Sequence, residues 1–384
     1  MPDPWTDPSL TAEQRAIAEL VHEIATEEIR PVAREADENE SFPEDAWDAL
    51  AEADLAGLTV PEEHGGVAAD RSTYAIVNEE VAYGGLAVAT ALSVHCLVTS
   101  CIATFGTDDQ RERWLPRMAR SGRPVGMFCL SEPQAGSNPA EMTTTATREG
   151  DEYVLDGHKR WITNGRRGGV AIVFAKTDPD DPDTVTQFLV PADADGFEPG
   201  EPERKLGLRA SDTTDVVLDG CRIPAENRLT EVGEGLASAF RILTGGRIGI
   251  GAQAVGLARA ALEEATTYAA DREQFGRSIS EFQSIRHTIA EMATRIEASR
   301  ELVRAACRRA EAGEDARVAA SMAKYFASET ATAVANDAIQ IHGGYGYTRE
   351  FPVERLYRDA KVTEIYEGTT QIQKTIIARG LLPE

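Results

Sequence analysis

The chain has 384 residues, enough for two or three domains around a large buried core. Hydrophobic residues make up 42% and charged residues 27%, as in an ordinary soluble globular protein. The net charge is −25, and six of the 39 basic residues are lysines. Such an acidic surface excludes nucleic acid and anionic membrane as general partners.

The acidity has two explanations. Self-repulsion can simply keep the protein soluble. Alternatively, the protein is halophilic, because at 1 M salt the Debye length falls to about 3 Å and such repulsion is screened. The shortage of lysine and the acidic run "DPDDPD" favour the halophilic explanation.

The cysteines and the chain start predict a cytoplasmic protein, and the histidines predict that it has no metal site. There are five cysteines, an odd number, and no C-x-x-C spacing. The start, "MPDPWTDPSL", has no basic-then-apolar signal. Reduced thiols in the cytoplasm are therefore expected. The six histidines show no metal-ligand spacing, so we expect no metal.

The first third of the chain is predicted to be helical. Helix-period apolar positions run through residues 11–36, 44–57 and about 70–118. Residues 84–107 have no charged side chain and resemble a membrane span, but they contain Ser, Thr, Gly and His. We therefore expect a buried pair of helices there and no membrane insertion. "SGRPVG" at 121–126 ends the helical pattern.

Between residues 125 and 223, the sequence pattern changes from helical periodicity to short strands. Runs such as "VAIVFAKT" and "TVTQFLVPA" are rich in Val, Thr and aromatic residues and are separated by Gly, Pro and Asp. Because no helical segment intervenes, an antiparallel sheet or barrel is expected. The acidic insert at 178–183 is predicted to be an exposed hairpin loop.

Helical patterning returns from about residue 231. An apolar stripe with three-and-four spacing runs from 282 to 306, and an Ala-rich helix is predicted over 314–342. Long, closely packed helices of this kind build a bundle. The predicted domains are thus 1–121, helical; 122–229, β; and 230–384, a helical bundle.

A near match to G-x-G-x-x-A occurs at Gly249, Gly251 and Ala254. No strand precedes it, so it indicates close helix packing and not a doubly wound dinucleotide site.

"YEGTTQIQ", residues 366–373, leaves two interpretations of Glu367 open. Thr369 or Thr370 can cap a final helix, and the helix dipole would then stabilise a carboxylate just ahead of it. Alternatively, Tyr366 and Gly368 shape the backbone to present Glu367 as a base. Glu364, one turn earlier, is expected to be a solvated or paired acid.

Three more segments are candidate ligand contacts. "FCLSEPQAGSNPA" (128–140) offers hydroxyl and backbone N–H groups to an anionic or heteroaromatic ligand, or is a plain loop. In "GHKRWITNG" (157–165), Trp161 and Thr163 share a strand face and either pack a flat ring or belong to the core. The glycines of "QIHGGYGYTREFPVERLYRDAK" (340–361) end a helix and allow close backbone approach.

In this order, the segments resemble the acyl-CoA dehydrogenase family of flavoenzymes over nearly the whole chain. The resemblance also rests on "LTVPEEHGG", "KLGLRASDTT", "GGRIGIGAQAVGLA" and "DREQFGRSI". It implies a mainly α protein with a helical N-terminal domain, a middle β-domain and a C-terminal four-helix bundle. It also implies FAD held between these parts and a neighbouring subunit, usually in a homotetramer.

The family oxidises acyl-CoA to trans-2-enoyl-CoA and passes electrons to electron-transfer flavoprotein. By resemblance, Glu367 is the catalytic base that takes the α-proton, while the β-hydrogen leaves as hydride to FAD. Some members carry the base on an earlier helix, where this chain has Gly246. The implied FAD contacts are Phe128, Leu130, Ser131, Gly136, Ser137, Trp161, Ile162, Thr163, Arg272, Phe275, Gln283, Gln340, Gly343, Gly344, Thr369 and Gln371. The implied substrate contacts are Ser137, Arg247, Tyr366 and Gly368.

Arg272, Phe275, Gln283, Gln340, Gly343 and Gly344 would hold the FAD of another subunit. Asn138, Pro139 and His342 depart from the family pattern, which affects fine contacts and not the reaction. The resemblance implies a short- to medium-chain or branched-chain enzyme, in fatty acid β-oxidation or branched-chain amino acid degradation. Two alternatives are an acyl-CoA oxidase that uses O2 and a non-catalytic flavin-binding assembly factor. Acyl chain length cannot be inferred from the sequence.

Overall fold

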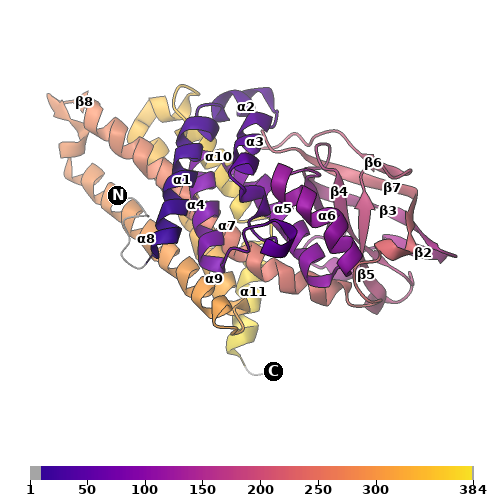
Figure 1. Cartoon of the computed structure of the whole chain (residues 1–384). Helices are drawn as coiled ribbons and strands as arrows, with labels where there is room; N and C mark the ends of the chain where they lie inside the picture. Colours follow the sequence, from indigo (N-terminus) through magenta and orange to yellow (C-terminus); the bar gives the residue numbers. More distant parts are fainter. Residues whose placement is uncertain (1–9, 383–384) are drawn as a thin grey trace.

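The computed structural model describes residues 10–382. The expectation that the chain start carries no targeting signal falls on residues 1–9 and lies outside this part. Helices, strands and helices follow one another along the chain, as predicted. The sheet forms one end of the molecule, and the long helices extend away from it toward the other end (Figure 1). The fold class expected from the sequence is confirmed.

The N-terminal part consists of short helices with local start signals. Thr11 and Thr107 each form a capping box, with Gln14 and Gln110 respectively. A π-helical turn, Ala25–Ile29, separates the first two helices. The helices are α1 (Ala12–Ile24), α2 (Ala33–Asn39), α3 (Glu44–Glu52), α4 (Arg71–Gly84), α5 (Leu86–Phe105) and α6 (Asp108–Ser121).

The uncharged stretch forms the single helix α5, so the expectation of a helix pair was wrong. Residues 86–105 contain neither Gly nor Pro, and nothing interrupts the helix before Gly106. Within residues 10–382, α5 is the one helix long and apolar enough to cross a membrane. However, 78% of its apolar window is buried inside the protein, which confirms that the stretch is buried.

The middle part is a seven-stranded sheet in the order β1-β4-β2-β3-β7-β6, with β5 also paired to β4. Most neighbours are antiparallel, but β1 and β2 each pair with β4 in parallel, so the sheet is mixed where we expected antiparallel strands. The β2–β3 hairpin lies between β1 and β4 in the chain, and this longer connection allows β4 to run in the same direction as β1. The strands are β1 (Gly126–Cys129), β2 (Thr145–Glu149), β3 (Glu152–Thr163), β4 (Val170–Lys176), β5 (Val185–Pro191), β6 (Phe197–Pro199) and β7 (Thr213–Pro224).

The acidic insert is an exposed loop of the β4–β5 hairpin, as predicted. Residues 178–183 are exposed and lie between two strands that pair antiparallel. Short 3-10 turns connect other elements: Leu55–Gly57, Glu62–His64, Pro139–Glu141, Pro182–Thr184, Ala225–Asn227, Ile279–Glu281 and Gly343–Tyr347.

The C-terminal part is built on three long helices. They are α7 (Gly235–Asp271), α8 (Gln283–Glu311) and α9 (Arg317–His342); α10 (Val353–Thr363) and α11 (Thr370–Leu381) complete the part. A two-stranded hairpin, β8 (Glu273–Gln274) and β9 (Arg277–Ser278), joins α7 to α8. It lies at the end of the molecule opposite the sheet (Figure 1).

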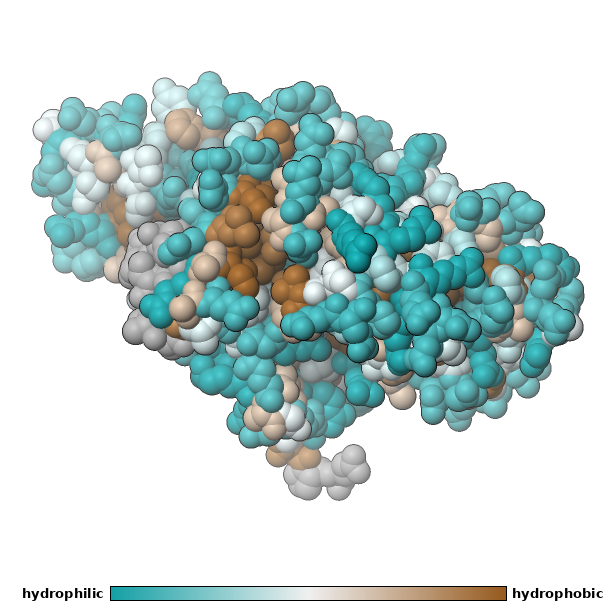
Figure 2. Space-filling view, viewed as in Figure 1, coloured by the Kyte–Doolittle hydropathy of each residue, from teal (hydrophilic) through white to brown (hydrophobic). Residues whose placement is uncertain are grey.

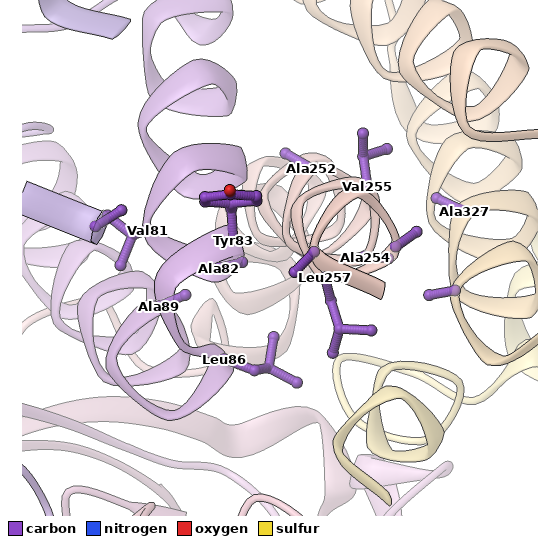
Figure 3. Packing of buried hydrophobic residues seen from close by; sticks show 14 of the residues in the cluster. Val81, Ala82, Tyr83, Leu86, Ala89, Ala252, Ala254, Val255, Leu257 and Ala327 are labelled. Atoms are coloured by element: carbon purple, nitrogen blue, oxygen red, sulfur yellow. The ribbon is translucent and has the colours of Figure 1, made fainter. Parts of the chain in front are cut away.

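The glycines of α7 allow close packing, as the near match to G-x-G-x-x-A predicted. A Cβ at Gly249 would lie 2.7 Å from the hydroxyl of Tyr74, and one at Gly251 would lie 3.1 Å from Cγ2 of Val303. Small residues of α7 therefore meet α4 and α8, and also α9, in one core, part of which Figure 3 shows around Ala82, Val255 and Ala327. The face seen in Figure 2 is mainly hydrophilic, with apolar side chains gathered near its centre.

Candidate active site

Glu367 lies in a short left-handed loop between α10 and α11. Its φ is 53°, and that of the following Gly368 is 90°. A left-handed backbone is uncommon for a residue with a side chain and often marks a functional site. Thr369 ends the loop as the N-cap of α11, because its side chain accepts a hydrogen bond from the N–H of Ile372.

Two buried side chains hold this loop. Nε2 of Gln373 donates to the carbonyl oxygens of Glu367 and Gly368, at 3.1 and 2.9 Å. From α9, Nζ of Lys324 donates to the same carbonyl of Gly368 at 2.7 Å. Both side chains are fully buried. The left-handed conformation is thus fixed from within the bundle.

The carboxyl group of Glu367 faces α7 at Gly246. A Cβ at Gly246 would lie 2.8 Å from Oε2 of Glu367 and 3.3 Å from Cδ2 of Leu97. Oε2 is shielded from solvent and, within residues 10–382, has no hydrogen-bond partner. Gly246 is the position at which some members of the resembled family were expected to carry the base. Because Gly246 has no side chain, the carboxyl of Glu367 can occupy that space.

Burial dominates the electrostatics of Glu367. It raises the pKa of the carboxyl to about 7, although Arg247 and Lys324 pull that pKa down. Burial also lowers the pKa of Lys324 to about 8 and moves that of Arg247 below its ordinary value. A carboxyl with a pKa near neutrality is well matched to general-base chemistry.

The two interpretations of Glu367 can now be separated. Thr369 caps α11, as the first interpretation expected, and the shielded, unpartnered Oε2 of Glu367 within residues 10–382 favours the second interpretation, a base. Glu364 is a paired acid, as expected: it accepts from Lys361 at 2.7 Å and from the hydroxyl of Thr332 at 2.6 Å.

Arg247 and Tyr366 belong to the surroundings of Glu367. Arg247 is 6% exposed, and its Nε is shielded without a partner in the described part of the chain. The hydroxyl of Tyr366 donates to Oε1 of Gln253 at 3.2 Å. The structure therefore groups these substrate candidates with Glu367.

Trp161 stands on a bulge of β3. Lys159 pairs with Val216 and Ile162 with Thr214, so β3 has one extra residue between these pairs. Trp161 has a φ of 64° and is 58% exposed, whereas Ile162 beneath it is buried. The guanidinium of Arg160 lies 4.8 Å from the centre of its ring. An exposed, strained tryptophan presents a flat apolar face to a ligand, which excludes the core interpretation for this residue.

The loop after β1 is anchored by a residue that we had not singled out. Glu132 pairs with Lys159 at 2.7 Å and accepts hydrogen bonds from Thr143 and Thr144. These partners hold the pKa of Glu132 down to about 2, against the effect of burial. An acid inside the sequence "FCLSEPQAGSNPA" was the available signal. The anchored loop leaves Gly136 exposed, where an added Cβ would meet open space.

A second group of candidates lies at the β8–β9 hairpin. Phe275 and Gly276 form its turn with φ of 56° and 77°, and Phe275 is 92% exposed. A cavity of about 540 Å³ next to the hairpin is lined by Tyr268, Arg272, Gln274, Ile279, Ile341, His342, Gly343, Gly344, Tyr345 and Thr348. Added Cβ atoms at Gly343 and Gly344 would meet open space.

His342, which departs from the family pattern, belongs to the wall of this cavity. It is 2% exposed, and its ring stacks on Tyr268 with centroids 4.2 Å apart. Its Nδ1 faces the carbonyl of Ala338 at 2.8 Å.

The structure divides the predicted FAD contacts between two places. Phe128, Leu130, Ser131, Gly136, Ser137, Trp161, Ile162 and Thr163 belong to β1, β3 and the loop after β1, and Thr369 and Gln371 to the start of α11. Arg272, Phe275, Gln283, Gln340, Gly343 and Gly344 belong to the hairpin end of α7, α8 and α9. The hairpin and the sheet lie at opposite ends of the molecule (Figure 1). One chain does not bring all these residues together.

The residues present fit a flavin dinucleotide. Near Glu367, three shielded polar atoms have no hydrogen-bond partner in residues 10–382: Nε of Arg247, Oγ1 of Thr370 and Oε1 of Gln373. A bound cofactor or substrate could supply these partners. The exposed ring of Trp161 suits a flat heteroaromatic system, and the open glycines of both groups leave room for close approach.

Comparison with known proteins identifies the class. Family models of the acyl-CoA dehydrogenase N-terminal, middle and C-terminal domains match residues 11–122, 127–221 and 233–382. The chain therefore belongs to the acyl-CoA dehydrogenase family. Proteins of this family are FAD-dependent oxidoreductases, and this chain is an enzyme of that kind.

Individual relatives cover almost the whole chain. An acyl-CoA dehydrogenase of Bacillus subtilis (strain 168) is 43% identical over 97% of this chain and 99% of its own length. An acryloyl-CoA reductase (NADH) of Anaerotignum propionicum is 40% identical over 98% of this chain and 96% of its own length.

Solved structures agree. Butyryl-CoA dehydrogenase of Megasphaera elsdenii has a TM-score of 0.95 and 37% identity, over 98% of this chain and 100% of that one. A chain in a structure described as an electron transferring flavoprotein of Acidaminococcus fermentans has a TM-score of 0.96 and 39% identity, with the same coverage.

Proposed function

We propose that this enzyme oxidises an acyl-CoA to its trans-2-enoyl-CoA, with Glu367 as the base that removes the α-proton. The observation that carries the proposal is the shielded carboxyl of Glu367, which has no hydrogen-bond partner in residues 10–382 and faces Gly246. An α C–H is a very weak acid, so the base needs a pKa well above that of a solvated carboxylate. Burial supplies this by raising the pKa of Glu367 to about 7.

The backbone of Glu367 supports the same chemistry. Among residues 10–382, its N–H group has no hydrogen-bond acceptor. That N–H is free to donate to the thioester oxygen and to stabilise the charge that develops there as the α-proton leaves. Gly368 leaves the approach open. Bound FAD would supply the acceptor for the β-hydride, with Trp161 and Thr163 placed to pack against its ring.

The divided cofactor site supports a homo-oligomer, and we propose a tetramer. In it, the hairpin group of one subunit would hold the FAD that lies on the sheet of another. Arg272 is exposed beside the cavity and offers a local positive charge to the pyrophosphate, which an acidic protein otherwise repels. The domain boundaries at 121/122 and 229/230 remain part of the proposal; α6 ends at Ser121 and α7 begins at Gly235.

Electron-transfer flavoprotein is the proposed electron acceptor. The similarity to a chain in a structure described as an electron transferring flavoprotein supports this choice. The similarity to a butyryl-CoA dehydrogenase supports a short acyl chain and a role in fatty acid β-oxidation. Branched-chain amino acid degradation and the cytoplasmic location stay predictions from the sequence; the five cysteines are free and buried.

Anaerobic titration of the purified flavoprotein tests the reaction. Straight and branched acyl-CoAs from C4 to C16 should bleach the flavin absorbance, and the panel would identify the preferred chain. An assembly factor would not bleach with any of them, and an acyl-CoA oxidase would recolour rapidly in air. Because one relative is named as an acryloyl-CoA reductase, the reverse assay with an enoyl-CoA and a reduced dye should be run beside it.

The halophilic character is proposed from composition. Raising NaCl from 0.05 to 2 M should raise the melting temperature, because screening weakens the self-repulsion of a net charge of −25. Sucrose of equal osmolality is the control, and equal stabilisation by sucrose would contradict the electrostatic explanation.

A further inference from the structure

Lys324 is a buried cation in the bundle that no sequence motif brought to attention. It lies on α9 with an exposed fraction of 0%. Among residues 10–382, its Nζ has one hydrogen-bond acceptor, the carbonyl oxygen of Gly368 at 2.7 Å. Burying an ammonium group costs free energy unless the group is paired with an acid, so an unpaired one suggests a functional role.

The groups that face this ammonium come from three elements. Among residues 10–382, the charges that act on it are those of Glu367 in the left-handed loop, Arg247 on α7 and Glu364 at the end of α10. Glu364 is already paired with Lys361 and with Thr332. The one acid left for Lys324 is therefore Glu367. Tyr74 on α4 and Tyr366 also interact electrostatically with Glu367. Their pKa values are raised, so both phenols are neutral and provide no charge to pair with Lys324.

We propose that Lys324 is a positioning residue for the base: its Nζ holds the carbonyl of Gly368, and its positive charge keeps the carboxyl of Glu367 ionised near neutral pH. This inference rests on the proposed role of Glu367. It assigns no direct contact with substrate to Lys324.

The hydrogen bond alone does not require a lysine. Gln373 already donates to the same carbonyl at 2.9 Å with a neutral amide. What the ammonium adds is charge. Without it, Arg247 would be the one remaining cation that opposes the effect of burial on Glu367. A more strongly protonated carboxyl removes the α-proton less often at pH 7.

Three variants separate the charge from the hydrogen bond. Lys324→Met removes both, Lys324→Gln keeps a donor without the charge, and Lys324→Arg keeps both. The matched control is Lys374→Met on α11, which removes a surface lysine that lies 3.4 Å from Glu329. Each is prepared as the FAD-loaded oligomer, and kcat/KM for the best acyl-CoA is measured from pH 5 to 9.

The expected result is a shift of the acidic limb of the pH profile. In Lys324→Met and Lys324→Gln, the limb should move up by about one pH unit or more, with a loss of about tenfold at pH 6 that shrinks at pH 8.5. Lys324→Arg and Lys374→Met should keep the wild-type profile. FAD content, from flavin absorbance, should stay unchanged in all four.

An unshifted limb in Lys324→Gln would overturn the inference, as would an equal loss of activity at every pH. If Lys324→Met does not fold, Lys324→Gln decides alone. Failure of the proposed function looks different: Glu367→Gln would then retain turnover, whatever the Lys324 variants do.

Discussion

Two loops of this enzyme adopt the same unusual backbone in opposite surroundings. In the Glu367 loop, which carries the proposed base, Glu367 and Gly368 have φ of 53° and 90°; at the β8–β9 turn, Phe275 and Gly276 have 56° and 77°. Donors from α9 and α11 hold the first loop. The second projects a phenyl ring that is 92% exposed.

The difference shows which part of the site one chain completes. The Glu367 loop has its hydrogen bonds, its shielding and its neighbouring cations within a single chain. The hairpin has a strained turn and an exposed aromatic ring, and nothing in residues 10–382 covers them. Positive φ is usual in a two-residue hairpin turn, but a phenyl ring that is 92% exposed is not, so we expect the proposed neighbouring subunit and its FAD to cover it.

The largest effect should come from the completed loop. Glu367→Gln keeps the shape of the side chain but removes the base, so turnover should fall about a thousandfold while FAD stays bound. Steady-state kcat with an artificial acceptor measures this, with Glu364→Gln as the control. Substantial activity in Glu367→Gln would place the base elsewhere.

The same substitution should change the pH dependence of stability. The pKa of Glu367 is about 7 in the folded protein against 4.5 in the unfolded chain. The folded state therefore binds this proton more tightly, and stability is lost as the pH rises from about 4.5 through 7. Glu367→Gln escapes this loss and should be more stable than wild type by about 3 kcal/mol at pH 8.

Urea unfolding at pH 5 and pH 8 measures that difference, which should shrink to about 1 kcal/mol or less at pH 5. Glu364→Gln is again the control, because it removes an ion pair with Lys361 and should not stabilise the protein. A Glu367→Gln variant that is no more stable than wild type at pH 8 would mean that the carboxyl is solvated.

At the hairpin, Phe275→Ala tests whether the exposed ring is covered in the assembly. Burial of a phenyl group contributes about 1.5–3 kcal/mol, so FAD retention or oligomer affinity should fall about 10- to 100-fold. Flavin release and size-exclusion chromatography measure both. Leu206→Ala, which truncates an apolar side chain that is 67% exposed, should change neither. A variant that keeps its oligomer and its flavin would leave the hairpin without this role.

The smallest effect is expected at the wall of the catalytic site. Gly246→Ala places a methyl group 2.8 Å from Oε2 of Glu367, so the carboxyl must shift. We expect kcat/KM to fall about tenfold, since misplacement of a base by about 1 Å is costly. The control is Gly251→Ala on the same helix, α7, whose methyl group would lie 3.1 Å from Cγ2 of Val303 on α8. Equal activities of the two variants would argue against contact between the carboxyl and α7.

Much of the site could be predicted from local sequence, and the misses have a common cause. The cap Thr369 was recognisable from residues a few positions away, whereas Glu367 was expected to be the base because of the family resemblance. Lys324 was missed because its contact with Gly368 joins positions 44 residues apart. Glu132, in the loop after β1, was missed because its partner Lys159 lies on the distant strand β3. The expected helix pair proved to be one helix because no Gly or Pro interrupts residues 86–105, and the sheet proved mixed because strand direction depends on distant neighbours.

The sequence by itself determined the order of helices and strands, the caps, the acidic surface and the identity of the acid at position 367. These follow from composition and from periodicity over a few residues. Only the tertiary structure decided that this carboxyl is shielded against Gly246, that Lys324 lies beside it, and that the hairpin group lies far from the sheet. The burial of a side chain, the charges around it and the distance between two groups of residues all depend on how segments far apart in the chain pack together.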